Sequence, residues 1–87
     1  MHKDDPRLVE YHEEEFHNGI GRVYKFKNGF GASVVKHDFS YGGKKGLWEL
    51  ALLDSEGELI YNSDYPDVVG YLNDPQVDRE LQRIARY

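Results

Sequence analysis

The stretch "IGRVYKFKNGFGASVVKH", residues 20–37, decides the fold. Two runs rich in β-branched and aromatic residues flank Asn28-Gly29, and an Asn-Gly pair between such runs is typical of a β-hairpin. We therefore expect antiparallel strands near 20–27 and 30–37, joined by a two-residue type I′ turn. The sequence does not decide which face of this hairpin is buried, because each face is mostly apolar at one of its ends. The predicted turn sets the cross-strand pairs Lys27 with Phe30, Lys25 with Ala32 and Val23 with Val34.

Two more strands are expected downstream of the hairpin. The run "LWELALL" (47–53) is apolar on both alternating faces, which is typical of a central strand. After the turn signal "DSEGE", the run "LIYN" (59–62) is expected to return as the fourth strand. The next segment, 63–72, is expected to hold one short helical turn.

The clearest helix signal is "NDPQVDRELQRIARY", which predicts a helix near 75–86. Its apolar residues follow the helical period and form one stripe. Two N-termini are possible for this helix. Either Asp74 is the cap and Pro75 lies in the first turn, or Asn73 and Gln76 form a capping box. The predicted architecture is α+β, a four-stranded antiparallel β-meander with a C-terminal α-helix packed on one face. The stripe comprises Val77, Leu81, Ile84 and Ala85.

Residues 1–19 are expected to lie outside the single α+β domain, which spans 20–87. "PRLVEYHEEEF" (6–16) has apolar residues at helical spacing, with Pro6 suited to a first helical turn. The segment is therefore a short N-terminal helix or an acidic extended arm. The sequence leaves open whether this arm covers the basic centre of the chain.

Composition narrows the functional classes. The 87 residues contain no cysteine, which excludes disulfides, thiolate zinc sites and a cysteine nucleophile. The four histidines lack metal-ligand spacing, no serine has a nucleophile-elbow context, and "GGKKG" (42–46) lacks the remainder of a phosphate-binding loop. We expect no cofactor, no metal and no enzymatic activity. A cytoplasmic location is expected, because no run is apolar enough to span a bilayer and the start has no secretory signal.

Charge is distributed unevenly along the chain, whose net charge is −5. Residues 1–21 are acidic, residues 22–46 carry six Lys or Arg against one Asp, and residues 47–87 are again acidic. Aromatic residues interleave with the lysines of the basic centre, so this region is the predicted binding surface. Its candidate residues are Lys25, Lys27, Phe30, Lys36, Phe39, Tyr41, Lys44 and Lys45.

Two kinds of partner fit that surface, and neither is a membrane. A protein partner needs no special motif, since segregated charge and Tyr-rich surfaces suit protein interfaces, and a second copy of the chain is one candidate. The alternative is single-stranded nucleic acid, with Tyr24 and Phe26 joining the set to stack on bases. The acidic net charge and the absence of a ribonucleoprotein motif count against that alternative.

Three segments resemble the sequences of small bacteriophage and prophage proteins: "NGFGASVV", "YGGKKGLWELALL" and "DVVGYLNDPQV". The resemblance covers roughly residues 22–85 and leaves out the acidic N-terminal segment. Proteins of this group are generally of unknown function, so no catalytic residues come with it. It implies a bacterial host cytoplasm and a small accessory or host-modulating role.

Overall fold

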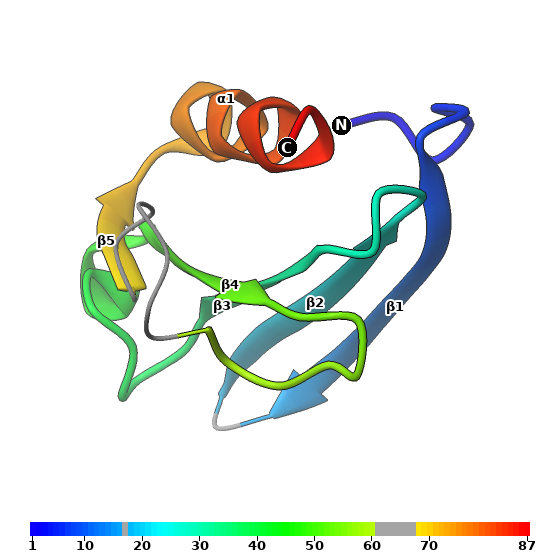
Figure 1. Cartoon of the computed structure of the whole chain (residues 1–87). Helices are drawn as coiled ribbons and strands as arrows, with labels where there is room; N and C mark the ends of the chain where they lie inside the picture. Colours follow the sequence, from blue (N-terminus) through cyan, green and yellow to red (C-terminus); the bar gives the residue numbers. More distant parts are fainter. Residues whose placement is uncertain (17, 61–67) are drawn as a thin grey trace.

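The computed structural model describes residues 1–16, 18–60 and 68–87, which form a sheet covered on one face by a helix (Figure 1). The sheet has five strands in the order β1-β2-β3-β4-β5, and every neighbouring pair is antiparallel. The α+β class, the meander and the C-terminal helix are thus confirmed, but the sheet has five strands and not four. The strands are β1 (Leu8–Phe16), β2 (Gly19–Phe26), β3 (Gly31–Lys36), β4 (Trp48–Leu53) and β5 (Val68–Leu72).

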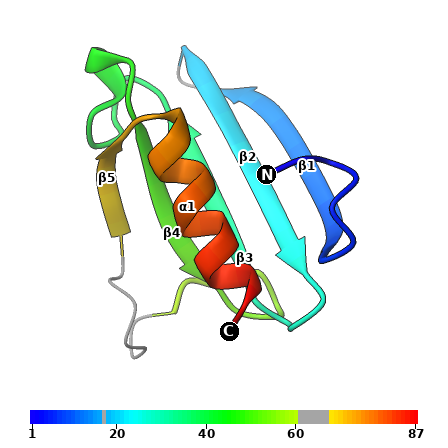
Figure 2. The same cartoon turned by 90° about the horizontal axis from the view of Figure 1, so that it is seen from above.

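Helix α1 (Asp74–Ala85) begins and ends within one residue of its predicted bounds. Of the two possible N-termini, the structure has the capping box. The Asn73 side chain accepts a hydrogen bond from the Gln76 amide, and the Gln76 side chain accepts one from the Asn73 amide. α1 lies across β3, β4 and β5, as the view from above shows (Figure 2). No described helix is long and apolar enough to cross a membrane.

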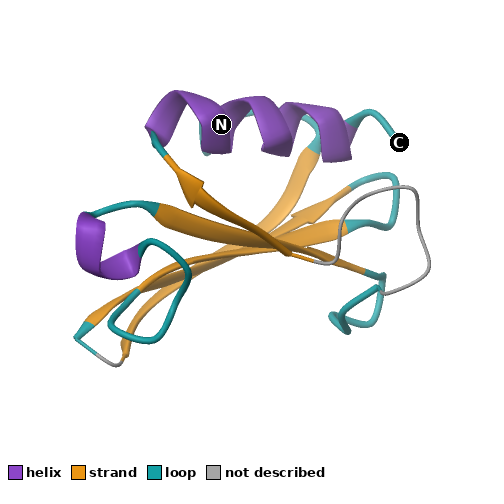
Figure 3. Ribbon diagram, turned by 90° about the vertical axis from the view of Figure 1, so that its left-hand side faces the viewer, coloured by secondary structure: helices purple, strands orange, loops and turns teal. Residues whose placement is uncertain are grey.

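α1 lies above one face of the sheet (Figure 3), and the core cluster lies between them. Alternate residues of the three middle strands point into it, and Val77, Leu81 and Ile84 of α1 close it from above. Since successive strand residues face opposite sides, this arrangement fixes which hairpin face is buried. The buried sheet residues of this core cluster are Tyr24, Phe26, Ala32, Val34, Trp48, Leu50, Leu52 and Leu72.

The predicted N-terminal helix is wrong, because residues 8–16 form edge strand β1. Its acidic side chains meet the basic side chains of β2: Glu13 Oε1 lies 2.8 Å from Arg22 Nε, and Glu10 Oε2 lies 3.4 Å from Lys25 Nζ. Tyr11 packs edge-on against Tyr24, with 5.1 Å between ring centroids. The acidic segment therefore lies beside the basic one as a paired strand within the domain.

The hairpin is present, but its predicted register is wrong by one residue. Ala32 pairs with Tyr24 instead of Lys25, and Ser33 with Val23. Its loop has three residues, since the Phe26 amide donates to the Phe30 carbonyl at 2.9 Å and only Gly29 takes a positive φ, +90°. This is the three-residue hairpin loop that ends in a left-handed residue, not a type I′ turn.

The predicted fourth strand is observed only in part. Leu59 forms an isolated antiparallel bridge with Leu53, and the Ile60 amide donates to the Leu52 carbonyl. The rest of 59–62, like 63–67, lies outside the described residues. Where a short helical turn was expected near 63–72, residues 68–72 form edge strand β5 instead.

Asn28 joins the hairpin loop to the end of α1. Its Oδ1 accepts from the Phe30 amide at 3.0 Å, while its Nδ2 donates to the carbonyls of Ile84 (2.8 Å) and Tyr87 (3.2 Å). We expect Asn28→Ala to lower the free energy of unfolding by about 1–3 kcal/mol, because it leaves these backbone groups without their partner. Urea denaturation followed by Trp48 fluorescence measures the loss. Lys27→Ala, on the exposed neighbouring loop residue, is the control, and an equal loss in both variants would contradict the bridging role.

Candidate functional site

The fold divides the predicted binding set between two ends of the sheet. Lys27 and Phe30 lie at the β2–β3 loop. Phe39, Tyr41, Lys44 and Lys45 lie in the 37–47 loop, which follows the other end of β3 and contains the short 3₁₀ helix η1 (Gly43–Lys45). The predicted set is therefore not one continuous surface.

Several predicted residues contact other parts of the protein. Lys25 on β2 is paired with Glu10. Phe30 packs edge-on against Tyr87, with 5.6 Å between the ring centroids, beside the end of α1. Lys36 is half-buried, with its Nζ 4.4 Å from the centroid of the Trp48 ring. These contacts give Lys25, Phe30 and Lys36 structural roles.

Trp48 is bordered by a second cation, Arg22, whose Cζ lies 4.5 Å from the ring centroid. The hydrogen bond from Arg22 to Glu13 lowers the pKa of the Glu13 carboxyl below its usual range, with a smaller contribution from the Tyr11 hydroxyl. Glu13 therefore stays ionised at neutral pH and holds Arg22 over the indole. This charged cluster supports the core beside α1.

Exposed aromatic side chains gather at the 37–47 loop. Phe39 is 79% exposed and Tyr41 63% exposed, and Tyr71 of β5, whose backbone bonds to that of Tyr41, is 55% exposed. The Nζ of Lys45 lies 5.7 Å from the centroid of the Tyr71 ring. We call the set Phe39, Tyr41, Lys44, Lys45 and Tyr71 the aromatic–basic end.

Backbone hydrogen bonds hold the aromatic–basic end in place. The Ser40 hydroxyl accepts from the His37 amide at 3.0 Å and donates to the His37 carbonyl at 2.9 Å. The Tyr41 amide donates to Glu49 Oε1 on β4 at 3.0 Å, and the Tyr71 amide donates to the Tyr41 carbonyl at 3.3 Å. The loop is thus attached to both β4 and β5 and presents its rings from a fixed backbone.

A shallow groove of about 290 Å³ crosses this end. A wider hollow of about 600 Å³ lies behind the loop, where Lys36, His37 and Asp38 meet the β1–β2 turn. In the described ranges, no three His, Asp or Glu side chains are placed to hold a metal ion. The groove is lined by Asp38, Ser40, Gly42, Lys44, Lys45 and Tyr71.

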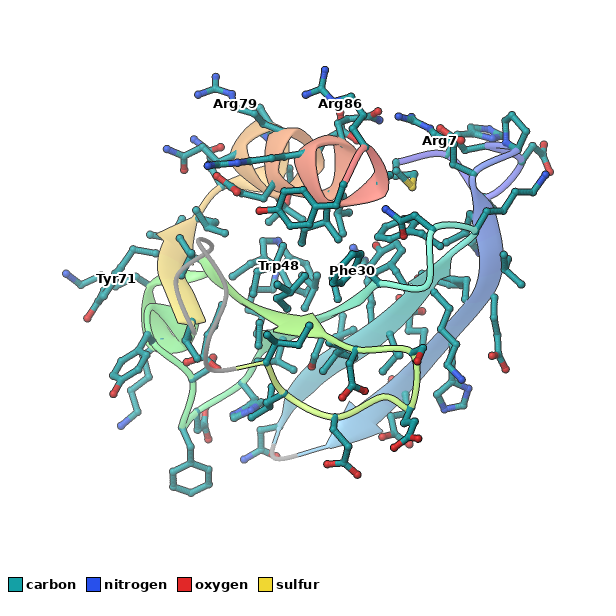
Figure 4. The ribbon with its side chains drawn as sticks, in the orientation of Figure 1. Arg7, Phe30, Trp48, Tyr71, Arg79 and Arg86 are labelled. Carbon is teal, nitrogen blue, oxygen red and sulfur yellow. The ribbon has the colours of Figure 1, made fainter. Side chains whose placement is uncertain are left out.

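Sequence reasoning missed exposed side chains outside the basic centre. Tyr71 belongs to an apolar run with no local charge to draw attention to it. Arg79 and Arg86 lie in a segment of acidic balance, yet both point from α1 away from the sheet (Figure 4). The shared face of the two arginines could have been predicted, because residues seven apart lie on the same face of a helix.

Comparisons of this chain with family models, with curated proteins and with solved structures found no significant match.

Proposed function

We propose that this protein is a non-enzymatic binding protein that recognises another protein through its aromatic–basic end. The observation that carries the proposal is a hydrogen-bonded loop that presents two exposed rings and two lysines, with the exposed Tyr71 ring of β5 bonded to it through the Tyr41 backbone. Single exposed apolar residues are ordinary on protein surfaces, but clustered aromatic ones mark interaction sites.

The composition of this end suits a protein interface. Tyrosine and phenylalanine are enriched at the centres of interfaces, where they bury large areas at low cost in conformational entropy. Lys44 and Lys45 would steer an acidic surface toward those rings and set its orientation. The loop is already ordered by its own hydrogen bonds, so binding would cost little further ordering.

The nucleic-acid alternative has less support. Tyr24 and Phe26, the rings assigned to base stacking, are 5% and 4% exposed and belong to the core. Lys25 and Lys27 lie near the β2–β3 loop, at the opposite end of β3 from Lys44 and Lys45, whereas proteins that bind single strands line up cations along the path of the nucleic-acid backbone. A protein partner is therefore the better-supported proposal.

The biological setting of the proposal follows from the sequence resemblance. We place the protein in a bacterial cytoplasm as a phage- or prophage-related accessory protein. A second copy of the chain remains a candidate partner, since acidic strand β1 lies on an open edge of the sheet. Both points are predictions.

A peptide selection tests the proposal. A displayed library of short random peptides is selected on the wild-type protein, and bound peptides are mapped by amide NMR shifts. We expect shifts at residues 38–46 and 71, and an affinity about tenfold weaker for the Lys44→Ser/Lys45→Ser variant, because two charge contacts are lost.

Lys27→Ser at the opposite end is the matched control and should leave the affinity unchanged. Shifts confined to other surfaces would contradict the proposal. The proposal would also be contradicted if the library yielded no binder and a mixed-sequence single-stranded oligonucleotide bound with a steep dependence on salt.

A further inference from the structure

Tyr71 has a backbone conformation that its side chain disfavours. Its φ is +58°, and among the described residues the only other non-glycine with a positive φ is Asn18, in the turn between β1 and β2. Asparagine tolerates the left-handed region, whereas a bulky aromatic residue there is an outlier. Such strain persists only where the surrounding structure imposes it, and it concentrates at functional sites.

The strain arises from a β-bulge in β5. Trp48 pairs with Leu72 and Leu50 with Val69, so Gly70 and Tyr71 together oppose Glu49. Bulges of this kind re-aim a side chain, and the left-handed position is ordinarily given to glycine.

The adjacent glycine does not take the positive φ. A Cβ on Gly70 would lie 2.6 Å from the Tyr41 Cβ, so Gly70 is required for close packing against the 37–47 loop. The tyrosine next to it is left with the unfavourable conformation.

The result of this conformation is an outward ring. Tyr71 projects away from the layer between α1 and the sheet in which Trp48 and Phe30 lie (Figure 4). More than half of the side chain is exposed, so the core gains little from it. Lys45 lies over the ring, and both residues line the groove. On one side the ring borders Gly42, where an added Cβ would lie 3.1 Å from Tyr71 Cδ1, and the rest of the ring is open to a partner.

We infer that Tyr71 is the anchor residue of the aromatic–basic end, and that its partner is a protein segment carrying one carboxylate beside an apolar side chain. The inference rests on the proposed function. The apolar side chain packs on the Tyr71 ring, and the carboxylate pairs with Lys44 or Lys45.

The charge of the groove selects this partner over a polyphosphate. Two lysines and Asp38 line it, which leaves a local surplus of one positive charge. One carboxylate matches that surplus, whereas a row of phosphates would meet Asp38 and the net charge of −5.

The test separates binding from stability. Tyr71→Gly and Tyr71→Asn remove the ring and suit the left-handed conformation, and Phe39→Gly is the control for Tm, because it removes an exposed ring from a residue without a positive φ. Thermal unfolding gives Tm, and fluorescence anisotropy gives the affinity for the strongest library-selected peptide and for its Glu→Gln form.

We expect Tyr71→Gly to bind that peptide about 30-fold more weakly, as expected for an interface anchor. Its Tm should be on the order of 5 °C above that of Phe39→Gly, because the strain is relieved. The Glu→Gln peptide should bind the wild type about tenfold more weakly.

Four results would overturn the inference. If Tyr71→Gly binds as the wild type does while the lysine variant does not, Tyr71 is not the anchor and the proposed function stands. If Tm and affinity fall together in both Tyr71 variants, the residue is structural. If no peptide binds the wild type, the proposed function fails and the inference with it. Anionic vesicles and an oligonucleotide are run in parallel, and preferential binding to either excludes a protein segment as the ligand.

Discussion

Replacing Trp48 with alanine is expected to lower the free energy of unfolding by about 3–5 kcal/mol. The indole is 3% exposed, and it packs in the layer between the sheet and α1. Its Nε1 donates to Asp74 Oδ1 at 2.8 Å, at the first residue of α1, while Arg22 and Lys36 lie over its ring. One truncation therefore opens a core cavity, frees the start of α1 and leaves two half-buried cations without their aromatic partner.

Two further variants separate these contributions. Trp48→Phe keeps most of the buried area and removes the hydrogen bond, so we expect a loss of about 1–2 kcal/mol. Phe39→Ala truncates a ring that is 79% exposed and should change stability by about 0.5 kcal/mol or less. Urea denaturation followed by far-ultraviolet circular dichroism measures all three without using the tryptophan signal. A loss below 1 kcal/mol for Trp48→Ala would show that the indole is not the centre of this core.

The helix was predictable because its determinants are local. The apolar stripe of α1 and both candidate caps lie within one short segment, and only the choice between the two caps needed the structure. The central position of β4 was also visible, since Leu50 and Leu52 lie on one face and Ala51 and Leu53 on the other, and all four are buried.

Strand β1 could not be predicted in the same way. Its three consecutive glutamates are poor strand formers, and Leu8 and Tyr11 fit a helical period as well as a strand with a bulge. On β2 the segment finds two basic partners, Arg22 and Lys25, which become adjacent to it only after the chain folds. The acidic segment followed by a basic one was thus a sign that β1 pairs with β2.

The register error in the hairpin has a similar origin. A two-residue and a three-residue loop both fit the "KNG" sequence, and the choice depends on Asn28 reaching the carbonyls at the end of α1. A slip of one residue transfers every paired side chain to the other face of a strand. The sequence also left open which hairpin face is buried, and Tyr24 and Phe26, the rings assigned to base stacking, lie on the buried one.

The candidate site was half predictable. Composition alone marked the 37–47 loop, because two aromatics, three glycines and two lysines follow one another there. Tyr71 reaches the same surface through a β-bulge, and a bulge leaves no mark in the local period. Lys27 and Phe30 are separated from this loop because they precede β3 and the loop follows it. The length of β3 therefore lies between the two groups.

Gly43→Ala is expected to disrupt the aromatic–basic end without removing any side chain from it. A Cβ at Gly43 would lie 1.8 Å from the His37 carbonyl oxygen and 2.5 Å from the Ser40 hydroxyl. The first of these is backbone and cannot rotate away, so the loop must open. We expect a loss of about 1–3 kcal/mol in the free energy of unfolding and large amide shifts across residues 37–47.

Two neighbouring variants isolate the cause. Lys44→Ala changes the next residue, which is exposed, and should leave both stability and the loop shifts nearly unchanged. Gly46→Ala meets no atom within 4 Å but has a φ of +76°, so it should cost about 1–2 kcal/mol through backbone strain alone. If Gly43→Ala leaves the loop shifts and peptide affinity at wild-type values, the close packing of η1 against His37 is not what fixes this surface. If affinity falls although every ring and lysine is retained, the fixed geometry of the loop is itself a requirement for binding.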